Sequence, residues 1–254
     1  MRRRTLLGAV MVGAVAPVLG CAPQGSLFDF SPPTGFKRSR PRAEECFPDS
    51  GVVELATAVQ GGETARIAEL VGSGVDPGSR GLDGVSLWDW ALRYRQPGSV
   101  RALAVAGTDL ELPGWFRRPP LMAAHAEGGV EQVQLLLDLG ADIEVVDSTG
   151  RTLLLRCVHG GDPTLPLLLA RGANLDARDV QGQTPLFAAC AVNAFGDALT
   201  LLQAGADPTI EDSRGDTFQV LLFGADQDIL NERARTEQDA VVAWLEEHGI
   251  PVER

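Results

Sequence analysis

The chain has 254 residues, of which 44% are hydrophobic and 22% are charged. These proportions are ordinary for a globular protein and exclude disorder over most of its length. Its formal charge of -12 and its pI of about 4.7 argue against nucleic-acid binding, because such proteins need a basic face to replace phosphate counterions. Lys37 is the only lysine, which argues against lysine Schiff-base chemistry and a P-loop.

Residues 1–20 are predicted to be an export signal. Three arginines precede an uncharged run, Leu6–Leu19, of 14 residues (19 − 6 + 1), too short to cross a hydrocarbon core of ~30 Å as a helix. The run ends at Gly20-Cys21 and resembles a bacterial lipobox, which implies cleavage before Cys21 and attachment of a diacylglycerol to its sulfur. An ordinary cleavable signal followed by a chance cysteine is the alternative. The arginines also resemble those of a twin-arginine export signal.

Residues 21–49 are predicted to be the lipidated cysteine and a proline-rich tether. A short basic cluster in the tether is interpreted as solvated, with contact to anionic head groups as the alternative. Ala22 stands where aspartate would favour retention in the inner membrane, by resemblance to the sorting of enteric lipoproteins. We therefore expect a periplasm-facing lipoprotein of the bacterial cell envelope, held in the outer membrane through Cys21.

Residues 50–254 form a repeat. Glycines that end apolar runs are spaced by 33, 33, 32 and 33 residues, and most of them begin a Gly-Ala-Asp-like string: Gly74, Gly107, Gly140, Gly172 and Gly205. This period and string resemble the ankyrin-repeat family. The resemblance implies an all-α ankyrin-repeat solenoid of about six helix-turn-helix units, joined by short hairpin fingers. No such unit can bury its apolar faces alone, so we expect one continuous core between neighbouring units.

Details of the repeat predict where helices begin and end. Thr184 is expected to cap a helix that starts at Pro185. Pro166 is expected to kink or shorten the second helix of the fourth unit. The last unit spans 44 residues (249 − 205) and so carries an insertion of 11 (44 − 33), assigned to residues 225–235, with Thr236 as a cap of its second helix.

No catalytic motif is present, so we predict neither an enzyme nor a cofactor. His159 and Cys157 are close in sequence, but two ligands do not make a tetrahedral site, and no metal is predicted. His125 takes an alanine-like position of the repeat and is expected to pack. Cys157 and Cys190 are predicted to be buried thiols, with a disulfide as the alternative. The aspartates that recur at repeat junctions indicate turn chemistry.

The predicted functional feature is a surface that binds another protein. The resemblance implies that partners contact the fingers and the exposed side of the first helix of each unit. Carried over by register, the candidate residues are Trp90, Arg93, Tyr94, Trp115, Phe116, Arg117, Arg156 and His159. Tryptophan, tyrosine and arginine dominate interface energetics, because they bury much area and keep a polar group. The alternative is that Trp88 or Trp90 fills space in an atypical early unit.

We therefore expect a lipid-anchored periplasmic protein that binds another protein. Ankyrin lipoproteins of this kind are similar to immunity proteins that neutralise secreted antibacterial effectors. The alternatives are an accessory protein for a periplasmic enzyme, including one that handles oxidants, and a structural lipoprotein of the envelope. Removal of the signal leaves 19 basic residues (22 − 3) against 34 acidic ones, a charge of about -15, which favours encounter with a basic partner.

Overall fold

The structure, a computed structural model, describes residues 41–224 and 230–253. Within these ranges the chain is helical, and an isolated bridge between Arg80 and Ser86 is the nearest approach to a strand. The all-α prediction is therefore confirmed. The predicted signal, Cys21 and most of the predicted tether lie outside the described residues.

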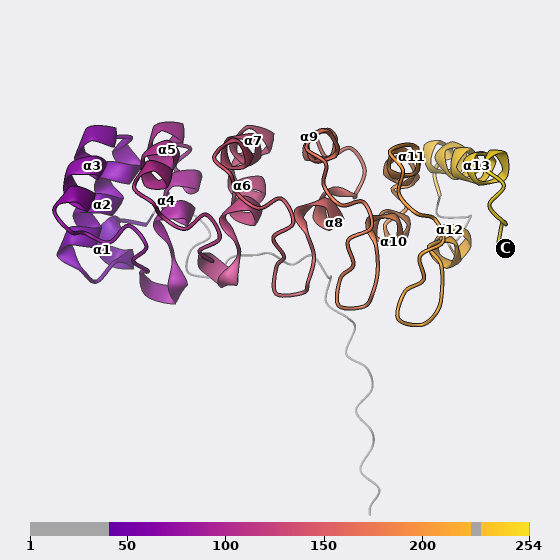
Figure 1. Cartoon of the computed structure of the whole chain (residues 1–254), viewed down its shortest axis with the longest axis horizontal. Coiled ribbons are helices and arrows are strands. Elements are labelled where there is room, and N and C mark those ends of the chain that lie inside the picture. Colours follow the sequence, from indigo (N-terminus) through magenta and orange to yellow (C-terminus); the bar gives the residue numbers. More distant parts are fainter. Residues whose placement is uncertain (1–40, 225–229, 254) are drawn as a thin grey trace, which may run out of the picture. The chain divides into compact units, whose positions relative to one another are not determined.

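Six helix pairs follow a short first helix, α1 (Ala43–Cys46), and succeed one another in chain order from indigo to yellow in Figure 1. The first helices of the pairs are α2 (Ser50–Gly61), α4 (Leu87–Arg93), α6 (Pro120–Gly128), α8 (Leu153–Cys157), α10 (Pro185–Ala191) and α12 (Gln219–Gly224). The second helices are α3 (Thr64–Gly72), α5 (Pro97–Val105), α7 (Val130–Asp138), α9 (Thr164–Ala170), α11 (Phe195–Gln203) and α13 (Glu232–Glu247). The loops from one pair to the next form the fingers, and the first two fingers contain single 3₁₀ turns, η1 (Leu82–Gly84) and η2 (Trp115–Arg117). The prediction of six units is confirmed.

Each pair buries its apolar faces against its neighbours. Helix α4 packs on both α2 and α6, and α10 packs on both α8 and α12, while the second helices α3, α5, α7 and α9 contact one another in that order. Leucines from different units, such as Leu55, Leu103, Leu136 and Leu168, are completely buried at these contacts. The core is therefore continuous along the row of helices, as the repeat requires.

The folded unit begins at Arg42, before the predicted boundary at Ser50. Helix α1 packs on α2, and the side chains of Cys46 and Phe47 are buried. The Phe47 ring meets the Trp90 ring edge-on, with centroids 5.5 Å apart. Residues 42–49 therefore belong to the array, and the assignment of these residues to a tether is wrong.

Helix boundaries correct two of the expected caps. The hydroxyl of Thr184 makes no capping hydrogen bond, although the residue occupies the N-cap of α10. Helix α13 begins at Glu232 because Asn231 Oδ1 accepts the Ala234 N–H at 2.8 Å, so Thr236 lies within the helix. Part of the predicted insertion, residues 225–229, lies outside the described residues.

The fourth pair is shortened as expected. Helix α9 has seven residues, whereas α7 and α11 have nine. Because α9 begins at Thr164, Pro166 falls in its first turn, where a missing N–H costs little. Among residues 41–224 and 230–253, every helix is too short or too polar to span a lipid bilayer.

Replacing Phe47 tests whether residues 42–49 stabilise the array. Phe47→Ala removes a buried ring and is expected to lower the free energy of unfolding by about 3–5 kcal/mol. Phe116→Ala is the matched control: this ring is 52% exposed, so its loss should change stability by less than about 0.5 kcal/mol. Urea denaturation measures both, and equal effects would show that Phe47 does not pack as described.

Candidate functional site

The later fingers share one construction, in which an aspartate closes the loop. In the fourth finger, the Asp179 N–H donates to the Gln183 carbonyl at 3.1 Å and the Gly182 N–H donates to the Asp179 carbonyl at 2.9 Å. Asp179 Oδ1 also accepts the N–H groups of Gln181 and Gln183. Asp147 and Asp212 do the same in the third and fifth fingers. The predicted turn role of the recurring aspartates is confirmed.

The second finger is built differently, because Gly114 stands where the later fingers have aspartate. The carboxylate of Asp89, on α4, replaces the missing acceptor: its Oδ2 accepts the Trp115 N–H at 2.8 Å and both the N–H and the hydroxyl of Ser86 at 2.9 Å. A Cβ on Gly114 would lie 1.8 Å from that oxygen, so the position requires glycine. Burial raises the pKa of Asp89, although the hydrogen bonds from Ser86 and Trp115 oppose this shift.

The tip of the second finger holds two side-chain residues in the left-handed region. Phe116 and Arg117 both have φ of 57°. At the position of Arg117 the other fingers have glycine with φ between 73° and 84°: Gly84, Gly150, Gly182 and Gly215. A side chain in this region costs of order 1 kcal/mol or more. Such strain is concentrated at functional sites, which makes this tip the candidate site.

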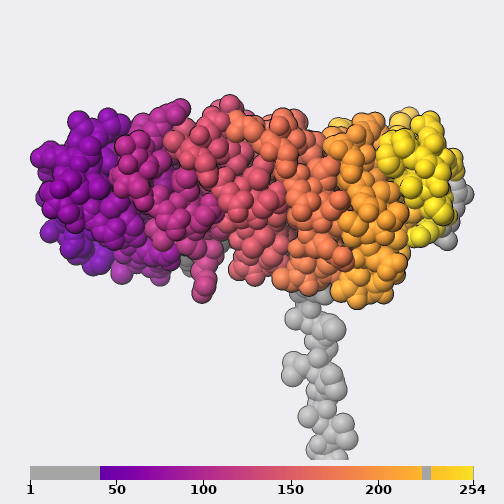
Figure 2. Space-filling model, viewed as in Figure 1, coloured from indigo at the N-terminus to yellow at the C-terminus, as the bar shows by residue number. Residues whose placement is uncertain are grey.

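The strained tip presents aromatic rings and arginines together. The Arg93 guanidinium lies 5.6 Å from the Trp115 ring centroid, and that of Arg118 lies 5.7 Å from the Phe116 ring centroid, within reach of cation–π attraction. These four residues and Arg117 are called the finger cluster. Figure 2 shows the segment between α5 and α6 as a knob on the lower edge of the row. The finger cluster therefore places large apolar and cationic groups where a partner can reach them.

The structure brings most of the first predicted group together but removes Trp90 from the surface. Arg93, Trp115, Phe116 and Arg117 lie in the finger cluster. Trp90 is completely buried, so its predicted exposure is wrong. Tyr94 is half-buried, with its ring centroid 5.2 Å from that of Trp90. Phe47 covers Trp90. Because residues 21–49 are predicted to be a tether, a residue before Ser50 is not expected to bury this ring.

Arg156 and His159 are engaged by acidic partners in the fourth unit. Arg156 Nε donates to Asp147 Oδ2 at 2.6 Å. Burial raises the pKa of Asp147, but hydrogen bonds from Thr149 and Arg156 outweigh it, so that the pKa lies below its usual value. His159 Nε2 is 3.1 Å from Asp162 Oδ2. These two candidates therefore belong to a different part of the array from the finger cluster.

A polar cluster that was not predicted lies between the third and fourth units. His125 Nε2 is 2.7 Å from Asp162 Oδ2 and 3.7 Å from Cys157 Sγ. His125 packs as expected, but against a carboxylate and a thiol. The repeat period could have predicted that these residues are neighbours. Val158 follows His125 by 33 residues and so takes the equivalent position in the next unit, between Cys157 and His159. Asp162 was missed because it lies in the loop before α9, outside the helix register.

Exposed apolar residues also lie on other fingers. Leu82 is 60% exposed on the first finger and Val180 is 70% exposed on the fourth. Val180 belongs to the fingers already expected to contact a partner, whereas Leu82 was missed because η1 has no counterpart in the repeat string. The finger side of the array therefore offers apolar contacts on several units.

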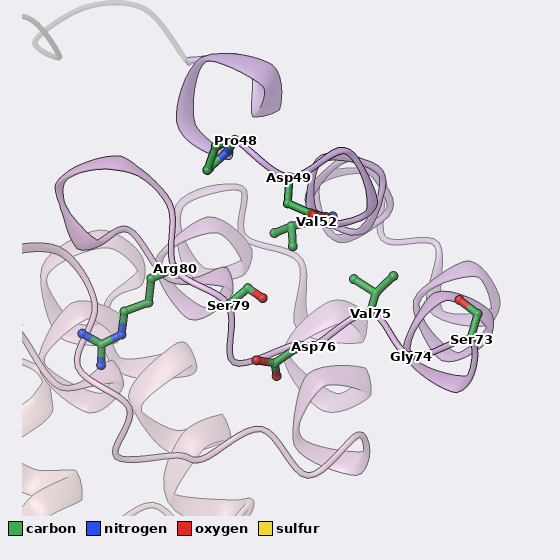
Figure 3. Close-up of a pocket in the computed structure, with 9 residues that line it drawn as sticks. All are labelled: Pro48, Asp49, Val52, Ser73, Gly74, Val75, Asp76, Ser79 and Arg80. Carbon is green, nitrogen blue, oxygen red and sulfur yellow. Dashed lines mark hydrogen bonds between the residues drawn. The ribbon is translucent and has the colours of Figure 1, made fainter.

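The first unit contains a hollow of about 490 Å³ (Figure 3). It is lined by Pro48, Asp49, Val52, Ser73, Gly74, Val75, Asp76, Ser79 and Arg80. Its two carboxylates are used in local structure, because Asp49 Oδ1 accepts the Val52 N–H and Asp76 Oδ1 accepts the Gly78 N–H. Both carboxylates are therefore already engaged by backbone N–H groups, and we assign no ligand to this hollow.

Stacked helix pairs with projecting fingers define a helical-repeat solenoid. Residues 121–212 match the family described as ankyrin repeats, in three copies. The ankyrin-repeat domain of Bcl-3, a member of the IκB family, is 31% identical, with a TM-score of 0.60 over 66% of this chain and 76% of that chain. The chain belongs to the ankyrin-repeat family, whose domains bind proteins and are typically non-catalytic.

Two curated proteins are similar over part of their length. B-cell lymphoma 3 protein from Homo sapiens is 34% identical over 154 residues, 58% of this chain. Palmitoyltransferase Hip14 from Drosophila melanogaster is 28% identical over 156 residues, 59% of this chain. The matches span 34% and 22% of these proteins, respectively.

Two bacterial structures share the fold at lower identity. An ankyrin-repeat domain from Acinetobacter baumannii is 22% identical, with a TM-score of 0.61 over 74% of this chain and 96% of that chain. A chain in the complex of a predatory endopeptidase from Bdellovibrio bacteriovorus with an immunity protein is 21% identical, with a TM-score of 0.57 over 74% of this chain and 97% of that chain.

Replacing Arg117 tests the strain at the second finger. Arg117→Gly places glycine at a left-handed position and is expected to raise the free energy of unfolding by about 1 kcal/mol. Arg101→Gly is the matched control: this exposed arginine lies within α5, where glycine should lower stability by about 1 kcal/mol. Urea denaturation reports the sign of both changes, and destabilisation by Arg117→Gly would contradict the strained geometry.

Proposed function

We propose that this protein captures one partner protein through its finger cluster and acts as an immunity protein that neutralises a secreted effector. The observation that carries the proposal is the strained tip, where Phe116 is exposed and Arg117 stands at a glycine position. A tip built for stability alone would have glycine there, as the other fingers do.

The finger cluster has the chemistry of an interface anchor. Trp115 and Phe116 supply apolar area, and the arginines supply cationic groups that bind carboxylates. The Nε atoms of Arg93 and Arg118 are buried and have no hydrogen-bond acceptor among the described residues. A buried donor without an acceptor costs free energy, which is a second sign that this tip is not built for stability alone. The cluster therefore fits an apolar groove with acidic groups at its rim.

The choice of an immunity role is supported by a structural neighbour and by the predicted export signal. The complex from Bdellovibrio bacteriovorus pairs an endopeptidase with an immunity protein, and a chain of that complex shares this fold. The lipobox-like ending at Cys21 would hold such a protein in the compartment that an envelope-attacking enzyme reaches. The proposed partner is accordingly a secreted enzyme encoded beside this protein.

Two exposed residues of the finger cluster provide the test of partner capture. The double variant Phe116→Ala/Arg117→Ala is expected to weaken binding of the neighbouring effector by at least ~10-fold, about 1.4 kcal/mol, because it removes the ring and the charge at the tip. Isothermal titration calorimetry measures the affinity, and circular dichroism verifies that the variant is folded.

The matched control changes an arginine and an apolar residue elsewhere. Arg101 and Val105 on α5 are both exposed, Val105 to 87%, so Arg101→Ala/Val105→Ala should bind like the unmodified protein. Deleting the gene beside an intact effector should be toxic. Equal binding by both double variants would remove the finger cluster from the interface, and growth without toxicity would contradict the immunity role.

The anchor is tested separately, by fractionation. Cys21→Ser removes the sulfur that would carry the lipid and should move the protein from the membrane to the soluble fraction, because anchoring depends on the buried acyl chains. Cys46→Ser is the control, because Cys46 is buried within the described fold and its sulfur cannot carry a lipid there. Retention of Cys21→Ser in the membrane fraction would overturn the proposed lipidation.

A further inference from the structure

Four side chains of types that bind transition metals meet between the third and fourth units. They are His125 from α6, Cys157 at the end of α8, and His159 and Asp162 from the loop before α9. The ligand atoms of His125, Cys157 and Asp162 all lie within 4.8 Å of one another. His159 approaches this group through Asp162, with its Nε2 at 3.1 Å from Asp162 Oδ2, and its half-exposed side chain must turn toward the other three to complete the site. We propose that these four residues bind one Zn²⁺ ion, which clamps the third unit to the fourth.

The distances favour a common ion over a catalytic relay. In a cysteine–histidine–aspartate triad, the thiol and the carboxylate contact opposite nitrogens of the imidazole, so that the ring passes a proton between them. Here Cys157 Sγ and Asp162 Oδ2 both lie at Nε2 of His125, at 3.7 and 2.7 Å. Atoms that converge in this way surround one point, as the ligands of a metal do.

The donor set fits zinc. Tetrahedral Zn²⁺ has bonds of about 2.0–2.3 Å to imidazole nitrogen, thiolate sulfur and carboxylate oxygen, so its ligand atoms lie about 3–4 Å apart. The contacts of 3.7 Å (His125–Cys157) and 3.1 Å (His159–Asp162) are in that range, and the 2.7 Å contact of His125 with Asp162 needs a small outward shift. A thiolate with imidazoles also disfavours Mg²⁺ and Ca²⁺, which prefer oxygen ligands.

The surroundings hold the ligands in place. Asp162 Oδ1 accepts the Thr164 N–H at 2.7 Å, which leaves Oδ2 directed at the two histidines. The loop that carries His159 and Asp162 is tied to the fifth unit, because the Gly160 N–H donates to Asp197 Oδ2 at 2.8 Å. Such supporting hydrogen bonds orient metal ligands. The side chain of Asp162 is 6% exposed and that of His159 is 50% exposed, so an ion can enter from the side of His159.

Binding changes one protonation state. The Cys157 thiol gives up its proton to solvent as the zinc–sulfur bond forms, while neutral imidazoles and the Asp162 carboxylate donate lone pairs. With two anionic ligands the site would be electrically neutral. The ion would replace the direct contacts of His125 with Cys157 and Asp162 by metal bonds, and it would strengthen the array where α8 is shortened to five residues.

Cobalt titration of the full chain tests the site, because Co²⁺ replaces Zn²⁺ and gives a thiolate-to-cobalt charge-transfer band. We expect this band in the unmodified protein and in Cys190→Ser, and its loss in Cys157→Ser. Cys190 is the matched control, because it is another buried thiol, on the adjacent α10. Zn²⁺ should remove the band by competition and should raise the Tm of the unmodified protein, but not of Cys157→Ser.

A second variant avoids the core. His159→Ala changes a half-exposed side chain, so the protein should keep its circular dichroism while its Co²⁺ affinity falls by at least ~10-fold. The proposal is overturned if the unmodified protein gives no band, or if the band persists in Cys157→Ser or is also lost in Cys190→Ser. Unchanged affinity in His159→Ala would contradict the four-ligand site.

Discussion

The structure depends on one constraint: no helix pair can bury its apolar faces by itself. Each pair therefore needs a neighbouring pair that presents equivalent apolar positions. The period of about 33 residues in the sequence reflects this requirement, because it places equivalent residues in adjacent pairs. Stability in such an array comes mainly from contacts between adjacent units. The first unit has the same need, and the segment from Arg42 to Asp49 meets it by covering α2 and Trp90.

The same offset organises the polar contacts between fingers. A carboxylate of one finger accepts a backbone N–H of the next at three successive junctions: Glu111 from Asp142 at 2.9 Å, Glu144 from Asn174 at 2.7 Å, and Asp176 from Asp207 at 2.9 Å. Many acidic residues of this acidic chain are therefore hydrogen-bonded within and between turns. The net charge alone does not describe the site, because the finger cluster is locally cationic.

Two departures from the repeat carry the two proposals. Arg117 occupies a left-handed position that glycine fills in the other fingers, and Asp89 reaches from α4 to hold the same loop. A cluster of histidine, thiol and carboxylate lies between the third pair and the short fourth pair, where the repeat usually has small packing residues. At both places the residue types differ from those that the repeat would place there for stability. Such departures are expected at functional or strained sites.

The fold class, the number of units, the shortened fourth pair and the aspartate turns could all be predicted from the amino-acid sequence, because these features follow from spacing and from local residue chemistry. The sequence also pointed to Arg93, Trp115, Phe116 and Arg117 as candidate partner-binding residues, and the structure brings these four together in the finger cluster. The burial of the aromatic rings could not be predicted in this way, because Phe47 covers Trp90 and no local pattern links residues 43 positions apart (90 − 47) in different elements. The structure likewise joined His125 to Asp162, because that contact depends on the path of the irregular loop before α9.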